Sequence, residues 1–144
     1  MRAFFAVFCL VSAFSVAGCG SDAGPAAGVA GGGVHDNTHL PPGDVARGQA
    51  LADKNSCTAC HGADYSGAGF NPNLTPSGAG LGTWSDAQIA AAIRDGVHND
   101  GEKLCSLMEQ FPFSDQETAD VIALLRSLAP SPKVTSVVCP GHGG

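Results

Sequence analysis

The chain has 144 residues and a formal net charge of −6 at pH 7, which suits one small domain. The acidic balance argues against a nucleic-acid-binding protein, because such proteins carry a basic stripe or patch. The negative charge would steer the chain toward a basic patch on a partner protein. A charge that serves only to keep the chain soluble is an equally good explanation of this composition.

Residues 1–18 predict a signal peptide that is not part of the folded domain. Arg2 supplies a positive start, and residues 3–17 supply an apolar run that is too short to cross a bilayer comfortably. The extreme N-terminal place and the basic start argue against the alternative, a buried core helix. The segment ends in Val-Ala-Gly-Cys at residues 16–19, which resembles the signal of bacterial lipoproteins.

Cleavage at a lipoprotein signal exposes a cysteine that is then acylated, so we expect lipid on Cys19. Acyl chains partition into a bilayer with about 0.8 kcal/mol per buried methylene, so several chains anchor a protein stably. Ordinary cleavage after small residues is the alternative, with Cys19 then a spare thiol or a disulfide partner. The predicted location is the bacterial cell envelope, facing the periplasm. Gly20 in place of an aspartate favours the outer membrane, by resemblance to lipoprotein sorting signals.

Residues 19–43 are rich in glycine and alanine and hold few large apolar side chains. Such a segment cannot bury enough surface to offset its ordering entropy, so we expect a flexible tether. His35 and His39 are interpreted as solvated linker histidines, with a metal site as the alternative. The folded domain with its C-terminal tail is expected over residues 44–144.

Residues 57–61 read Cys-Thr-Ala-Cys-His. A Cys-x-x-Cys pair serves as a redox dithiol, as half of a zinc site or as a covalent haem attachment. In redox dithiol proteins a strand precedes the motif, and no strand is evident before residue 57. A zinc site needs four ligands, and only three candidate ligands are close together in this sequence. Two thiols that add to the porphyrin vinyl groups, with the next residue on the iron, fit the spacing directly. The motif therefore predicts one covalent haem c held by Cys57, Cys60 and His61, whose Nε2 would bind iron.

With this motif in place, residues 45–128 resemble the small mono-haem class I cytochromes c. Residues 47–62 resemble their first helix and attachment loop, and Pro-Asn-Leu at 72–74 resembles their segment beneath the proximal histidine. The resemblance implies an all-α fold of three to four helices around one haem. It also implies that the Pro72 carbonyl accepts the Nδ1–H of His61 and that Leu74 packs on the haem. A plain turn role is the alternative for Pro72.

Residues 73–97 further resemble cytochromes, or cytochrome domains, that accept electrons from periplasmic dehydrogenases. In many of these proteins a tryptophan donates its indole N–H to a haem propionate, and Trp84 is the candidate here. A packing role is equally open, because Trp84 precedes a predicted helix and is placed to pack on Ile89.

Met108 lies in a segment that resembles the methionine loop of the same family, although the proline of that loop comes later than usual. The resemblance implies that Met108 is the second axial ligand, and loss of Met1 with the signal peptide leaves it the only methionine. Core filling by Met108, ligation by His98 or His142, and an open site remain alternatives. A thioether ligand favours ferrous iron and raises the reduction potential, which suits electron transfer better than catalysis.

Cys105 and Cys139 both follow the haem motif in a chain that is predicted to be exported, where thiols tend to pair. A bridge between them would stabilise the fold by about 4 kcal/mol on a chain-entropy model. Buried free thiols and intermolecular pairing are the alternatives.

Three helices are expected, over residues 44–55, 85–96 and 114–129, from apolar residues at helical spacing. Ser85 with Gln88, and Ser114 with Glu117, match the capping box that starts a helix. The last helix is expected to cross the first at Gly48, where the missing side chain permits close approach.

These features predict an exported, lipid-anchored mono-haem cytochrome c that carries single electrons and is not itself an enzyme. Its expected partners are redox proteins, either a periplasmic dehydrogenase or a terminal oxidase or reductase, and the membrane through the lipid. The alternatives are an electron-accepting subunit of a periplasmic dehydrogenase, a haem-based gas sensor and, more distantly, a zinc-bound structural lipoprotein.

Overall fold

The computed structural model describes residues 35–135, and every structural statement below concerns this part of the chain. It consists of α1 (Val45–Lys54), α2 (Cys57–His61), the short 3-10 helix η1 (Leu81–Thr83), α3 (Asp86–Asp95) and α4 (Asp115–Ser127). Within residues 35–135 the extended pairing is limited to one isolated bridge, between Val97 and Lys103. The predicted all-α fold class is confirmed.

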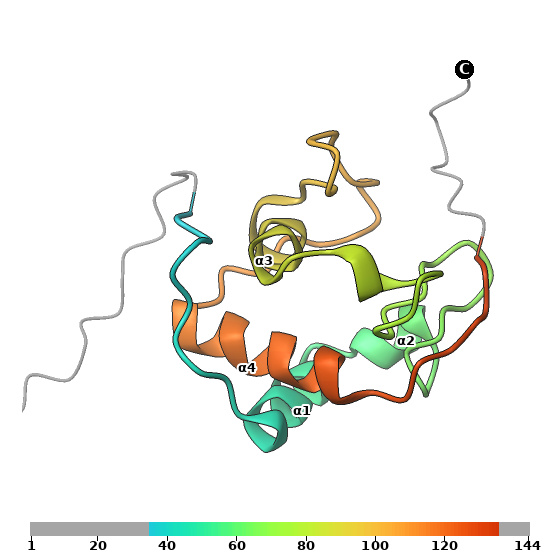
Figure 1. Ribbon diagram of the computed structural model, residues 1–144, viewed down its shortest axis with the longest axis horizontal. Helices are drawn as coiled ribbons and strands as arrows, with labels where there is room; N and C mark the ends of the chain where they lie inside the picture. Colours follow the sequence, from blue (N-terminus) through green and yellow to red (C-terminus); the bar gives the residue numbers. More distant parts are fainter. Residues whose placement is uncertain (1–34, 136–144) are drawn as a thin grey trace, which may run out of the picture.

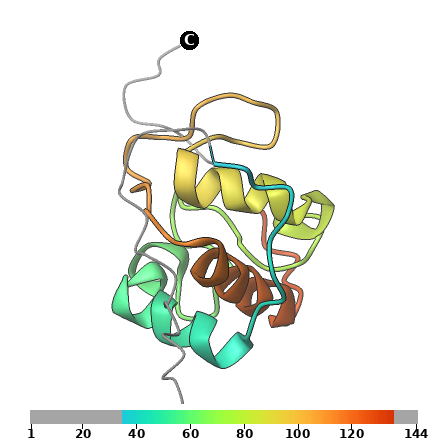
Figure 2. The same cartoon turned by 90° about the vertical axis from the view of Figure 1, so that its left-hand side faces the viewer.

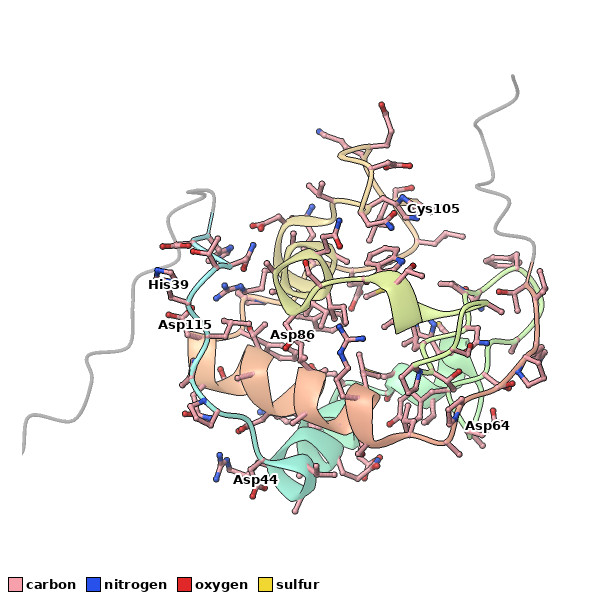
Figure 3. All side chains as sticks on the ribbon, in the orientation of Figure 1. His39, Asp44, Asp64, Asp86, Cys105 and Asp115 are labelled. Atoms are coloured by element: carbon pink, nitrogen blue, oxygen red, sulfur yellow. The ribbon has the colours of Figure 1, made fainter. Side chains whose placement is uncertain are left out.

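The three long helices begin where the sequence places their caps. The Asp44 side chain accepts a hydrogen bond of 2.8 Å from the backbone N–H of Arg47 at the start of α1. Both predicted capping boxes are present, at Ser85 before α3 and at Ser114 before α4. These side chains satisfy N–H groups that have no partner inside the helix. Figure 3 labels Asp44 and Asp115 at the starts of α1 and α4.

Helix α4 packs against both α1 and α3, and Figures 1 and 2 show α4 between the other two helices. The predicted crossing of α1 and α4 at Gly48 is confirmed, since a Cβ at this residue would lie 2.0 Å from the Asp120 carbonyl oxygen. The core gathers around α4, whose Val121, Ile122, Leu124 and Leu125 are all buried. α1 adds the buried Ala52, and its half-buried Leu51 packs against the same cluster. The polypeptide core is thin, so apolar bulk from another source would stabilise the fold.

Residues 35–43 belong to the segment that we expected to be a flexible tether, and the structure shows them in contact with α3 and α4. The Nδ1 of His35 lies 2.7 Å from a carboxylate oxygen of Asp95, and Asn37 donates to the other oxygen at 2.9 Å. Gly43 lies against the Ala119 carbonyl. His39 is exposed, as expected for a solvated histidine.

The predicted signal peptide, the predicted lipid attachment site at Cys19 and the first part of the predicted tether lie outside the described residues. No helix in residues 35–135 has both the length and the apolar character that a membrane crossing requires.

Candidate functional site

The short helix α2 carries the three residues of the Cys-x-x-Cys-His motif. Cys57, Cys60 and His61 occupy positions i, i+3 and i+4, which share one face of a helix. Cys57 is half-buried and Cys60 is exposed, and both are free thiols. Two thiols and an imidazole therefore lie on one short helix, as covalent haem attachment requires.

The imidazole of His61 is buried, with 6% of its surface exposed, and has a defined hydrogen-bond partner. Its Nδ1 lies 3.0 Å from the Pro72 carbonyl oxygen. Because a carbonyl only accepts, Nδ1 carries the proton and the lone pair is left on Nε2. Burial lowers the pKa of His61, and the bond to Pro72 opposes this in part. The ring is therefore neutral at pH 7, with Nε2 ready to bind a metal. The Pro72 contact that the resemblance implied is present.

The same surroundings weaken the zinc alternative. Burial raises the pKa of the Cys57 thiol, and the nearby Asp53 and Cys60 act in the same direction. Forming the thiolate that zinc binds therefore costs more free energy at Cys57 than at an exposed cysteine. In the described part of the chain, moreover, no three or more Cys, His, Asp or Glu side chains converge as metal ligands would. The donor set fits haem c better than a structural zinc ion.

Leu74 and Trp84, the other two residues that the resemblance implied near the haem, are both half-buried and pack on the core. The Trp84 ring meets the His98 ring edge to face, with centroids 4.8 Å apart. The Nδ1 of His98 lies 3.0 Å from a carboxylate oxygen of Asp100. Sequence reasoning missed the Trp84–His98 contact, because nothing local links a tryptophan before α3 to a histidine after it.

Met108 is half-buried in a turn between α3 and α4, where its backbone N–H donates to the Cys105 carbonyl at 2.9 Å. The loop is tied back to α3 by the Phe111 N–H, which donates to the Ile93 carbonyl at 2.9 Å. Cys105 is labelled on this loop in Figure 3. Its predicted partner Cys139, like His142, lies outside the described residues, so the disulfide stays a prediction.

Asn73 is a residue of the site that sequence reasoning did not single out. It follows Pro72 directly and is 2% exposed. Its Oδ1 accepts from the Thr75 backbone N–H at 2.9 Å and from the Thr75 hydroxyl at 2.7 Å. The Asn-Leu-Thr pattern at residues 73–75 was an available signal, because Asn side chains often bond the backbone two residues on.

Two free thiols and a buried imidazole on one turn of an all-α fold fit a protein that binds haem covalently. The family model described as Cytochrome c matches residues 45–129, more than half of the chain. The chain therefore belongs to the cytochrome c family. No curated protein matches it.

Members of this family hold haem c through covalent bonds, so haem c is the cofactor and electron transfer is the general function. The residues present fit that group: Cys57 and Cys60 supply two free thiols, and His61 supplies an Nε2 lone pair. When bound, the haem supplies the one-electron ferric–ferrous couple. The chain would hold the haem through the two cysteines. It also orients the His61 imidazole and keeps that ring buried from water.

Proposed function

We propose that this cytochrome c is an exported, lipid-anchored class I mono-haem electron carrier whose iron lies between His61 and Met108. The observation that carries the proposal is the buried His61 ring, with Nδ1 3.0 Å from the Pro72 carbonyl oxygen. This bond fixes the tautomer and the ring orientation, and it makes the imidazole a better donor.

Met108 is proposed as the second axial ligand for two reasons. It is the only methionine that remains once Met1 is removed with the signal peptide, and its loop is held by backbone hydrogen bonds to Cys105 and α3. A thioether favours the ferrous state and completes the coordination sphere. Both effects suit reversible electron transfer and disfavour the gas-sensor alternative, which needs an open position.

The lipid anchor is proposed on Cys19, from the Val-Ala-Gly-Cys sequence that follows the apolar run. The protein would then face the periplasm from the cell envelope, with the outer membrane favoured by Gly20. Intact mass of the mature protein tests this proposal. A mass that equals the unmodified chain starting at Cys19, or any cleavage elsewhere, would contradict it.

The proposed partners are redox proteins, with a periplasmic dehydrogenase as donor or a terminal oxidase or reductase as acceptor. The likeness of residues 73–97 to dehydrogenase-linked cytochromes supports the first, and the net charge of −6 supports steering toward a basic partner surface. Co-purification with a dehydrogenase would make the chain a subunit of that complex. Reduction by several unrelated donors would make it a general shuttle.

A disulfide between Cys105 and Cys139 is proposed as a tie between the methionine loop and the C-terminal tail. Thiol titration of the unfolded, unreduced holoprotein is expected to find neither sulfhydryl. Two free sulfhydryls would contradict the bridge, and a mass of twice the chain that reduction halves would show pairing between molecules.

The visible spectrum of the purified protein, oxidised and reduced, tests the central proposal. We expect a low-spin haem c whose reduced form is inert to carbon monoxide, and haem that stays with the chain on a denaturing gel. A variant with Cys57→Ser and Cys60→Ser should lose the covalent haem. A colourless protein, exported by cells equipped for cytochrome c maturation, would contradict the proposal.

A further inference from the structure

Residues 131–135, which we call the C-terminal strap, lie along the loop that joins α2 to η1 and carries Pro72. The Asn73 backbone N–H donates to the Thr135 hydroxyl at 3.2 Å, and the Ser131 N–H donates to the Thr75 hydroxyl at 3.0 Å. Figure 1 shows the red end of the described chain running beside this green loop. The strap therefore reaches the segment beneath the proximal histidine, far from it in sequence.

One of these contacts falls on the peptide unit that faces His61. The Pro72 carbonyl, 3.0 Å from His61 Nδ1, and the Asn73 N–H are the two polar ends of this one peptide. The unit is planar and trans, so its carbonyl and its N–H point in opposite directions. Thr135, which holds the N–H, therefore also fixes the direction in which the Pro72 carbonyl points.

The Asn73 side chain holds the strap in place from inside. Its Nδ2 donates to the carbonyl oxygens of Ser131 at 3.0 Å and of Lys133 at 2.9 Å. Its Oδ1 accepts from the Thr75 backbone N–H at 2.9 Å. A buried amide with both ends engaged has little freedom to rotate, so the backbone on either side of it is held as well.

Close packing adds to these hydrogen bonds. A Cβ at Gly67 would lie 2.6 Å from Thr135 Cγ2 and 3.0 Å from the Asn73 nitrogen. Lys133 Nζ donates to the Gly67 carbonyl, and the Gly67 N–H donates to the His61 carbonyl at 2.8 Å. The strap thus contacts the loop at a glycine that is itself bonded to the histidine backbone.

We propose that the C-terminal strap is a positioning element for the proximal histidine. Thr135 and Asn73 orient the Pro72 carbonyl, and that orientation sets the strength of the hydrogen bond it accepts from His61. The inference rests on the proposed function in one respect, that His61 is the iron ligand. A firmer Nδ1–H bond makes the imidazole more basic and favours ferric iron. Loosening the strap therefore raises the reduction potential.

The test compares Thr135→Val, which removes the hydroxyl and keeps the shape, with Thr135→Ser, which keeps the hydroxyl. Thr38→Val is the matched control, because the Thr38 hydroxyl is exposed and bonds only Asp36. The full exported holoproteins are compared in reduction potential and in hydrogen exchange of the His61 Nδ1–H, followed by NMR. Thermal unfolding shows that each variant is folded.

Thr135→Val is expected to raise the potential and to speed Nδ1–H exchange by up to about fivefold, less than the loss of a whole hydrogen bond would give, because the bond to Pro72 is weakened and not removed. Thr135→Ser and Thr38→Val should stay at the wild-type values. If Thr135→Val is folded but keeps the wild-type potential and exchange rate, the strap is structural only and the inference fails. A wild-type protein without haem c, or with an iron that His61 does not bind, overturns the proposed function and this inference together.

Discussion

The guanidinium of Arg47 holds the carboxylate of Asp120 by two hydrogen bonds, 2.7 Å from Nε and 2.9 Å from Nη2. The Asp44 N–H donates to the same carboxylate at 2.7 Å, and Gln116 Nε2 donates at 2.9 Å. Asp120 is 2% exposed, so this group of contacts joins the start of α1 to the middle of α4. The hydrogen bonds from Arg47, Asp44 and Gln116 together lower the pKa of Asp120 from 3.8 to about 2, with Arg47 the largest cause.

This lowered pKa predicts an acid-sensitive contribution to stability. A carboxyl group whose pKa is lower in the folded state stabilises the fold fully above its unfolded pKa, and the contribution is lost as the pH falls from about 4 toward 2. The contribution of Asp120 at pH 7 is on the order of 2 kcal/mol. Urea unfolding of the holoprotein between pH 2 and pH 7 measures it.

Asp120→Asn should be less stable at pH 7 by that amount, and its stability should fall less steeply below pH 4. Asp86→Asn is the control, because the exposed Asp86 pairs with Arg126 at the surface and such pairs contribute about 0–1 kcal/mol. Parallel pH curves for wild type and Asp120→Asn would contradict the assignment.

The crossing of α1 and α4 predicts a second effect, at Gly48. An alanine there would place its Cβ 2.0 Å from the Asp120 carbonyl oxygen and 3.1 Å from Leu124 Cβ. The helices must move apart, at a cost of about 1–3 kcal/mol or more. Thermal unfolding checks this, with Gly78→Ala as control because nothing lies within 4 Å of a Cβ at Gly78. Equal stability of the two variants would mean that the crossing is looser than the structure shows.

The contacts of Arg94 predict how residues 35–37 are held. The Arg94 side chain is 1% exposed and donates to Asp115 at 2.6 Å, and its Nε donates to Asn37 Oδ1 at 3.0 Å. Arg94→Met removes both contacts but keeps a long apolar side chain. We expect a loss of about 1–3 kcal/mol, because Asn37 and the loop around it lose hydrogen bonds.

Hydrogen exchange at residues 35–43 gives the local measurement, and protection there should drop in Arg94→Met. Asp115→Asn is the comparison, because it removes the ion pair with the buried Arg94 and keeps the hydrogen bonds from Arg94 to Asn37, so protection at residues 35–43 should change less. Unchanged protection in Arg94→Met would show that Arg94 does not hold this segment.

Local signals in the sequence predicted the helices well. Ser85 with Gln88, and Ser114 with Glu117, are three residues apart, and both capping boxes formed as expected. Gly48 marked the helix crossing because only one residue type permits that approach. The spacing of the Cys-x-x-Cys-His motif is enough to predict its geometry, because one helical turn places Cys57, Cys60 and His61 on the same face.

Contacts between distant residues were the part that sequence reasoning missed. Asn37 and Asp95 are 58 positions apart, and so are Asn73 and Ser131. In both cases a polar segment of low hydrophobicity is held by side-chain hydrogen bonds, which leave no periodic pattern. For this reason the sequence predicts a flexible tether at residues 35–43 and a tail at the C-terminal strap.

Met108 provides the last prediction, which separates electron transfer from ligand sensing. Met108→Ala should remove the thioether, lower the reduction potential by on the order of 0.1 V within the ~0.8 V that axial ligands span, and open a position for carbon monoxide. The loop itself should persist, because it is held by backbone hydrogen bonds from Met108 to Cys105 and from Phe111 to Ile93.

His98→Ala is the matched variant, since His98 is the rival ligand and lies against Trp84. If His98→Ala alone shifts the potential and admits carbon monoxide, the iron is bis-histidine ligated. If neither variant changes either property, the sixth position is open or filled from outside residues 35–135, and Met108 is an ordinary packing residue.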